Sequence, residues 1–143
     1  MYGKLGDYAF AGSYNLNNVD VSGTDVIAKN VFNGCIALAN LKIGSDVSSI
    51  EELAFVDCAN LSTIVLNKSV KSVGKNAFAL CDNLTALYYD GAYSDWTSVE
   101  FAGGNTNLTA VTRYYSVKEP GEICNYWSYD ENGKIVAINE EDK

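Results

Sequence analysis

The hydrophobic and polar positions of this chain repeat with a period of 22 or 23 residues through its first two thirds. Four segments align in register: 5–26, 27–49, 50–72 and 73–95. One position of the repeat is always phenylalanine and another is always leucine: Phe10, Phe32, Phe55 and Phe78, and Leu16, Leu38, Leu61 and Leu84. A unit of this length cannot bury its apolar residues alone and gains a core only by stacking on its neighbours. The pattern therefore predicts a solenoid.

Each coil of this solenoid is predicted to contain one short strand and one helical turn. In the third segment, Ile64 and Leu66 are two residues apart and so point to the same side of a strand. Thr63 and Val65 would then point to the opposite side. The stretch 51–58 has apolar residues spaced for a single helical turn. We expect the strands of successive coils to pair in parallel.

The third segment also carries a family resemblance. Its pattern I-x-x-x-A-F-x-x-C-x-x-L-x-x-I-x-L is formed by Ile50, Ala54, Phe55, Cys58, Leu61, Ile64 and Leu66. This pattern resembles the BspA-type leucine-rich repeats of bacterial surface proteins, over about residues 5–95. The commoner leucine-rich type would place Asn or Cys where this chain has Ser69. The resemblance implies a right-handed parallel β-sheet solenoid with short helical turns, used for protein binding or adhesion, and it implies no enzyme.

The repeat becomes weaker after residue 95 but does not end there. Trp96 lies 23 residues after Val73, and Phe101 lies 23 residues after Phe78. These spacings predict a degenerate fifth coil over 96–113.

The solenoid is thus predicted to span 1–113, and 114–143 to form a C-terminal β cap and an acidic tail. Asn132-Gly133 lies between two apolar runs and is a strong signal for a β-hairpin. We expect this aromatic-rich hairpin to cover the apolar end of the last coil. The start of the chain has no equivalent cap, so either preceding repeats or a partner would cover it.

Charge and hydropathy exclude some classes of partner. The net charge is -8, with -2 on residues 1–73 and -6 on residues 74–143. No basic run is present, so we expect no nucleic-acid binding. No apolar stretch approaches the ~18 residues that a membrane span requires. The first residues also lack the pattern of a signal peptide, so a cell-surface or secreted location rests on the resemblance alone.

The sequence offers little catalytic chemistry. It contains no histidine, which removes the usual general base and the commonest metal ligand. We therefore predict no enzyme activity, no metal and no cofactor. Cys35, Cys58 and Cys81 occupy one position of the repeat and are expected to form a buried column. Cys124 lies outside the column, either as a free thiol or paired elsewhere.

Recognition is expected on the outward side of the strands, where repeat proteins commonly bind their partners. The candidate partner-binding residues on this face are Asp20, Asn40, Lys42, Thr63, Val65 and Tyr88. The aromatic C-terminal end is an alternative surface. A plain solvated sheet face, and an aromatic end that is only the core of the cap, are the alternatives without function.

Three functions follow from these observations. The first is a bacterial binding or adhesion module that recognises a protein or a host matrix component, with carbohydrate as a further candidate ligand. The second is a small acidic intracellular inhibitor or assembly factor that binds a basic protein. The third is one stretch of a longer stalk.

Overall fold

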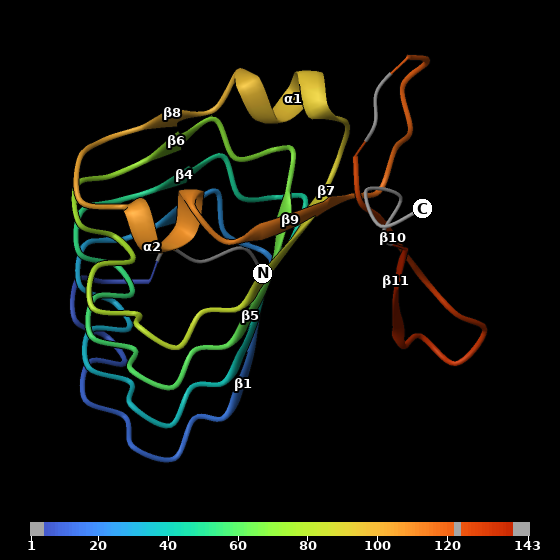
Figure 1. Cartoon of the computed structure of the whole chain (residues 1–143). Helices are drawn as coiled ribbons and strands as arrows, with labels where there is room; N and C mark the ends of the chain where they lie inside the picture. Colours follow the sequence, from blue (N-terminus) through green and yellow to red (C-terminus); the bar gives the residue numbers. More distant parts are fainter. Residues whose placement is uncertain (1–4, 122–123, 139–143) are drawn as a thin grey trace.

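The computed structural model describes residues 5–121 and 124–138, which form a parallel β solenoid with two sheets (Figure 1). The larger sheet has the strand order β1-β3-β5-β7-β9-β10-β11. Its strands are β1 (Asn18–Val21), β3 (Asn40–Ile43), β5 (Thr63–Asn67), β7 (Ala86–Asp90), β9 (Thr112–Tyr115), β10 (Tyr126–Tyr129) and β11 (Ile135–Ile138). The smaller sheet contains β2 (Val26–Ile27), β4 (Ser49–Ile50), β6 (Ser72–Val73) and β8 (Glu100–Phe101). The solenoid predicted from the repeat is confirmed.

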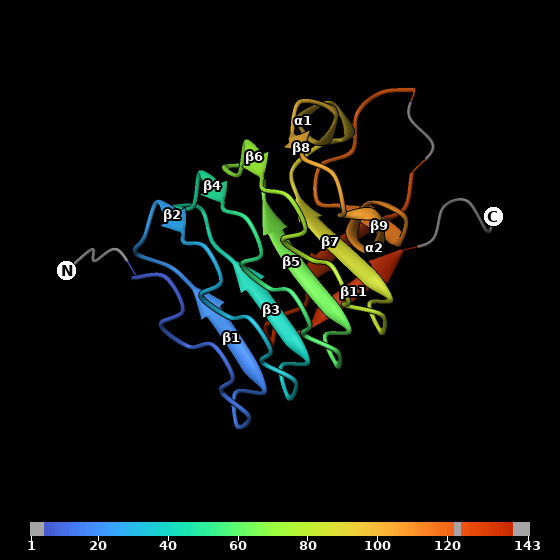
Figure 2. The same ribbon diagram turned by 90° about the vertical axis from the view of Figure 1, so that its left-hand side faces the viewer.

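The parallel register follows the repeat of the sequence. Leu41 pairs with Ile64, and Ile64 pairs with Leu87. Equivalent residues of successive coils therefore lie side by side, as Figure 2 shows for the strands β1, β3, β5 and β7. Because side chains alternate along a strand, one apolar column faces the interior and the next column faces outward.

Two residue columns fill the interior of the coils. The rings of Phe10, Phe32, Phe55 and Phe78 stack with centroid distances of 5.5, 5.1 and 5.1 Å. The cysteine column is also buried, as predicted. Each of its thiols donates a hydrogen bond to a phenylalanine carbonyl of the preceding coil, for example from Cys58 Sγ to Phe32 O at 3.3 Å. The cysteines thus act as small core residues.

The helical turn expected in each coil is wrong in its detail. Residues 52–57 form consecutive tight turns, in which Val56 N–H bonds to Leu53 O and Cys58 N–H to Phe55 O. Leu53 and Asp57 have φ near 60°, which a helix does not allow. Backbone bonds to the next coil, such as Phe55 N–H to Ala77 O at 2.8 Å, stabilise this conformation. The apolar spacing of a helical turn therefore also fits a stack of turns.

The fifth coil exists, but its predicted alignment is wrong. Val73 pairs with Phe101 rather than standing one period before Trp96. The helix α1 (Tyr93–Thr97) is inserted between β7 and β8 and shifts the register by five residues. Its Trp96 covers the core instead, with its ring 5.3 Å from Tyr89 and 5.0 Å from Phe101. A second short helix, α2 (Thr106–Thr109), precedes β9.

Asn105 completes the fifth coil with its side chain. Its Oδ1 accepts the backbone N–H of Phe78, where Ala77 O accepts the equivalent N–H of Phe55. Its Nδ2 donates to Gly74 O and Ala102 O, both at 2.9 Å. One buried amide therefore substitutes for backbone bonds that the irregular coil cannot make.

The predicted hairpin is present and extends the larger sheet beyond β9. Tyr126 pairs with Tyr115 in parallel, and β10 pairs with β11 in antiparallel fashion. Figures 1 and 2 show that the body of the hairpin lies on the outer side of the larger sheet, opposite the interior of the coils. The hairpin thus joins the last strand, as a cap would, and also lies over the strand face. The acidic tail expected after residue 138 lies outside the described residues.

The two ends of the core differ in exposure. Phe10, in the first coil, is 39% exposed, whereas the other phenylalanines of the column are buried. A hollow of about 430 Å³ at this end is lined by apolar residues that include Leu5 and Leu16. Within the described residues, the first coil thus leaves its apolar side accessible, as the sequence predicted.

Candidate functional site

The outward face of the larger sheet and the C-terminal hairpin enclose a hollow of about 640 Å³. Its floor comes from β1, β3, β5 and β7, and its wall comes from the hairpin residues Tyr129, Gly133, Lys134 and Ile135. We name this hollow the strand-face groove. It exists because β10 leaves the edge of the sheet and carries the turn of the hairpin across the outward side chains.

All six residues predicted as partner-binding line the strand-face groove: Asp20, Asn40, Lys42, Thr63, Val65 and Tyr88. The parallel register aligns Asp20 with Lys42, Lys42 with Val65, and Val65 with Tyr88. The sequence thus placed these residues together correctly. Whether they bind a partner is a separate question, which their position alone does not answer.

A polar ladder crosses one side of the groove floor. Asn40 Nδ2 donates to Asn18 Oδ1 at 2.9 Å, and Thr63 Oγ1 donates to Asn40 Oδ1 at 2.6 Å. These bonds fix the orientation of both asparagine side chains. The second N–H of each amide is left to meet either solvent or a ligand.

An aromatic cluster closes the other end of the groove. Tyr88 stacks on Tyr114 with a centroid distance of 5.2 Å, and Trp127 meets the Tyr88 ring edge-on at 5.8 Å. Trp127 in turn meets the ring of Tyr129 at 5.0 Å. Burial, and to a smaller extent the neighbouring Tyr114, raises the pKa of Tyr88. This end is therefore apolar and densely packed.

Lys42 links the floor of the groove to the hairpin. Its Nζ lies 5.3 Å from the centre of the Tyr129 ring, which is the geometry of a cation–π contact. Asp20 is its register partner on β1, yet among the described residues the only ion pair joins Lys29 to Glu52. Lys42 therefore directs its charge toward the hairpin.

Sequence reasoning missed the wall of the groove. Tyr129, Lys134 and Ile135 were expected in a cap over the end of the core, because an Asn-Gly turn predicts a hairpin but not its position. A weak signal was available: Trp127 and Tyr129 alternate with Ser128, so one face of β10 is aromatic throughout and needs a surface to pack on.

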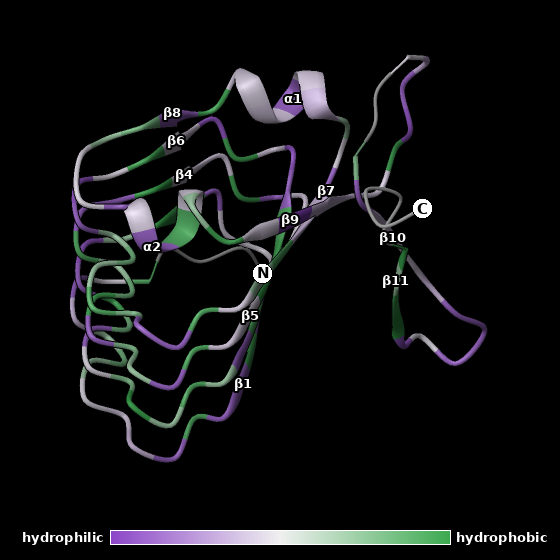
Figure 3. Ribbon diagram, in the orientation of Figure 1, coloured by the Kyte–Doolittle hydropathy of each residue, from purple (hydrophilic) through white to green (hydrophobic). Residues whose placement is uncertain are grey.

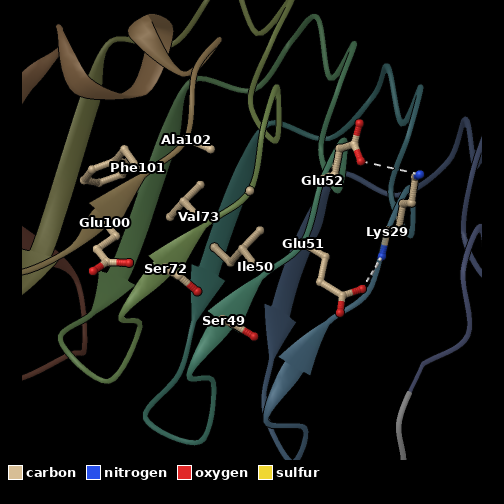
Figure 4. Close-up of a pocket in the computed structure, with 11 residues that line it drawn as sticks. Lys29, Ser49, Ile50, Glu51, Glu52, Ser72, Val73, Glu100, Phe101 and Ala102 are labelled. Atoms are coloured by element: carbon tan, nitrogen blue, oxygen red, sulfur yellow. Dashed lines mark hydrogen bonds and ion pairs between the residues drawn. The ribbon is translucent and has the colours of Figure 1, made fainter.

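A second hollow, of about 730 Å³, lies over the smaller sheet (Figure 4). Three carboxylates line it: Glu51, Glu52 and Glu100. Glu52 pairs with Lys29 at 3.5 Å, and Glu51 Oε2 accepts the backbone N–H of Lys29 at 3.1 Å. We name this the acidic hollow. Glu100 projects into it from β8, and the sequence analysis did not single it out.

The described residues offer no metal-binding group. No cluster of three or more Cys, Asp and Glu side chains suited to an ion occurs within residues 5–121 and 124–138. Burial raises the pKa of the Cys35 thiol, while the neighbouring Cys81 thiol and burial raise the pKa of Cys58. Both thiols are therefore poor nucleophiles at neutral pH. In the same residues, no helix has the length and apolar character to cross a membrane.

Comparison with known proteins agrees with this architecture. The family model of the BspA-type leucine-rich repeat region matches residues 3–130 in six copies. A similar solved structure is that of a leucine-rich cell-surface protein from Faecalibacterium prausnitzii A2-165, with 29% sequence identity and a TM-score of 0.53. The match covers 57% of this chain and 21% of that chain. Among curated proteins, none is significantly similar in sequence.

These similarities indicate a repeat module for protein interaction. Leucine-rich repeats of this kind are generally scaffolds without enzymatic activity. With 128 of its residues matched by one family model, the chain belongs to the BspA-type leucine-rich repeat family.

Proposed function

We propose that this chain is a non-enzymatic binding module of a bacterial surface or secreted protein, and that its strand-face groove holds an extended segment of a partner protein. One observation carries the proposal: six strand residues and the hairpin wall converge on a single hollow of about 640 Å³. The likeness to a bacterial cell-surface protein supports the proposed location.

The two ends of the groove favour different parts of a partner. Asp20, Lys42 and the Asn18–Asn40–Thr63 ladder present charge and amide groups at one end. Val65 and Tyr88 present an apolar surface at the other end. A segment with an aliphatic or aromatic residue beside polar residues would match this arrangement, and apolar anchors of this kind commonly dominate binding energy.

The groove suits a peptide better than a sugar ring. Sugars usually bind by stacking on the open face of an aromatic ring. Here one face of Tyr88 is occupied by Tyr114, and Lys42 lies over the ring of Tyr129. Protein is therefore the proposed ligand class, and carbohydrate is the less favoured alternative.

A peptide-display experiment tests the proposed function. Random dodecapeptides would be selected on the folded chain, and the affinity of enriched peptides would be measured by calorimetry. Thr63→Arg places a large side chain on the groove floor and should reduce affinity at least tenfold, because it fills the site. Ser72→Arg, at a half-buried serine that lines the acidic hollow, is the matched control and should leave affinity unchanged. Equal affinity for the Thr63→Arg variant and the unaltered chain would refute the groove as the site.

The acidic hollow supports a second candidate function, the binding of a basic protein. Glu51, Glu52 and Glu100 gather there in a chain of net charge -8. Such binding would depend on exposed charges, which salt screens over about 8 Å at physiological ionic strength. Affinity for a polylysine probe should fall steeply with salt and should weaken in the Glu100→Gln variant. Binding that is independent of salt would exclude this candidate.

A further inference from the structure

The C-terminal hairpin is firmly anchored at its base and weakly held along the rest of its length. Asn125, Tyr126 and Trp127 are buried. Trp127 Nε1 donates to Tyr89 O at 2.9 Å, and Tyr115 N–H donates to Asn125 O at 2.9 Å. From Ser128 onward almost every residue is exposed or half-exposed. The change in burial occurs between two adjacent residues, Trp127 and Ser128.

The outer part of the hairpin makes few contacts with the sheet that it crosses. Among the described residues, its hydrogen bonds are internal, such as Gly133 N–H to Asp130 O at 3.0 Å. Its polar contact with the floor is the one between Lys42 and the Tyr129 ring. Val136 and Ile138 are each 42% exposed, and Figure 3 shows β11 as hydrophobic while the adjoining turn is hydrophilic.

The floor nevertheless differs beneath the hairpin. Lys42, on β3, is exposed, as expected of an outward position, whereas Val65 at the same position of β5 is only 8% exposed. β5 is buried at its three central positions, while β3 alternates between exposed and buried. The hairpin thus restricts access to Val65 without packing into the groove.

We propose that the hairpin 128–138 is a movable strap, hinged after Trp127 and latched to the sheet by Lys42 and Tyr129, which controls entry to the strand-face groove. An exposed cation–π contact is weak compared with a charge-assisted hydrogen bond. A ligand that offers an anionic group to Lys42 would therefore release the latch as it enters. The strap goes beyond the proposed function, because its motion can be tested without any partner.

Hydrogen exchange on the unaltered chain is the first test. The strap opens by a local motion, so amides of β10 and β11 should exchange faster than amides of β5 and β7, which open only when the solenoid unfolds. Equal protection of the hairpin and of β5 would show that the hairpin is a rigid wall and would overturn the proposal.

Thiol labelling of a Val65→Cys variant measures access to the groove directly. Adding Lys42→Met, which removes the charge but keeps a long side chain, should raise the labelling rate about two- to fivefold, the change that an exposed cation–π contact supplies. Tyr129→Ala should give a similar rise. Val99→Cys is the matched control, because Val99 is 9% exposed and lies outside the groove. A Val65→Cys labelling rate that neither variant changes would also overturn the latch.

Discussion

Trp127 donates a hydrogen bond from its indole Nε1 to the backbone carbonyl of Tyr89, at 2.9 Å and across 38 residues of sequence. Trp127 belongs to the C-terminal hairpin, and Tyr89 belongs to the fourth strand of the solenoid sheet. This bond joins the one part of the chain that does not repeat to the part that does. It also determines where the hairpin crosses the strand face.

Replacing Trp127 should therefore affect both stability and groove geometry. Trp127→Phe removes the hydrogen bond but keeps an aromatic ring, so we expect a loss of about 1 to 2 kcal/mol in the free energy of unfolding. Trp127→Ala also removes the packing against Tyr88 and should cost about 3 to 5 kcal/mol. Urea unfolding followed by circular dichroism measures both. A Trp127→Ala variant as stable as the unaltered chain would show that the hairpin is not anchored there.

Asn105 should be among the most sensitive polar residues of the chain. It is 3% exposed and makes three hydrogen bonds to the backbone. Asn105→Ala leaves these buried groups without partners, and should cost about 2 to 4 kcal/mol in the free energy of unfolding. Asn107→Ala is the control, since Asn107 makes a single 3.4 Å contact near the surface, and it should cost under about 0.5 kcal/mol. Similar losses for both variants would contradict the role of Asn105.

Gly74 should tolerate no side chain. A Cβ added there would lie 2.5 Å from the backbone N of Glu52 in the preceding coil. Gly74→Ala must therefore push two coils apart, at a cost of about 1 to 3 kcal/mol. At Gly103 a Cβ would meet no atom within 4 Å, so Gly103→Ala should change stability by under about 0.5 kcal/mol. Thermal unfolding of both variants provides the comparison, and an unaffected melting temperature for Gly74→Ala would contradict the close approach.

The chain should lose stability in alkaline solution. The pKa values of the Cys35 and Cys58 thiols are raised above their ordinary value of 9.0, and burial raises that of Tyr89 above 10.0. Groups with a raised pKa stay protonated in the folded state, so their contribution is complete below pH 9 and is lost as the pH rises further. Each thiol should contribute a slope of about 1.4 kcal/mol per pH unit above that point.

Urea unfolding at several pH values between about 8 and 10.5, under reducing conditions, measures this slope. The double variant Cys35→Ala, Cys58→Ala should show a shallower fall in stability than the unaltered chain. A midpoint that stays constant across this range would show that the column thiols ionise as readily in the folded state as in the unfolded state.

Much of the fold was predictable because the same physical requirement recurs in every coil. Phe55 and Leu61 stand at positions that must face the interior in each repeat, and strand alternation then places Val65 outward. The fifth coil was misaligned because α1 inserts five residues while its Trp96 still falls, by coincidence of spacing, one period after Val73. A spacing rule cannot distinguish such an insertion from a true repeat.

The groove was half predictable for a similar reason. The floor residues, such as Lys42 and Val65, follow from the register of parallel strands. The wall residues Tyr129 and Ile135 depend on long-range packing of Trp127 against Tyr89, which no local pattern in the sequence encodes. The tight turns at Leu53 and Asp57 were likewise missed, because positive φ at these residue types is unusual and is maintained by bonds to the next coil.

The central claim is that the strand-face groove is the surface that binds a partner segment. The most direct test is to titrate the isotopically labelled chain with the tightest peptide from display selection and to follow its NMR resonances. We predict perturbations at Lys42, Val65, Tyr88 and Ile135, with little change at Ser49 and Ser72 on the other sheet. Perturbations confined to Ser49, Ser72 and their neighbours in the acidic hollow, with the groove resonances unchanged, would contradict the account.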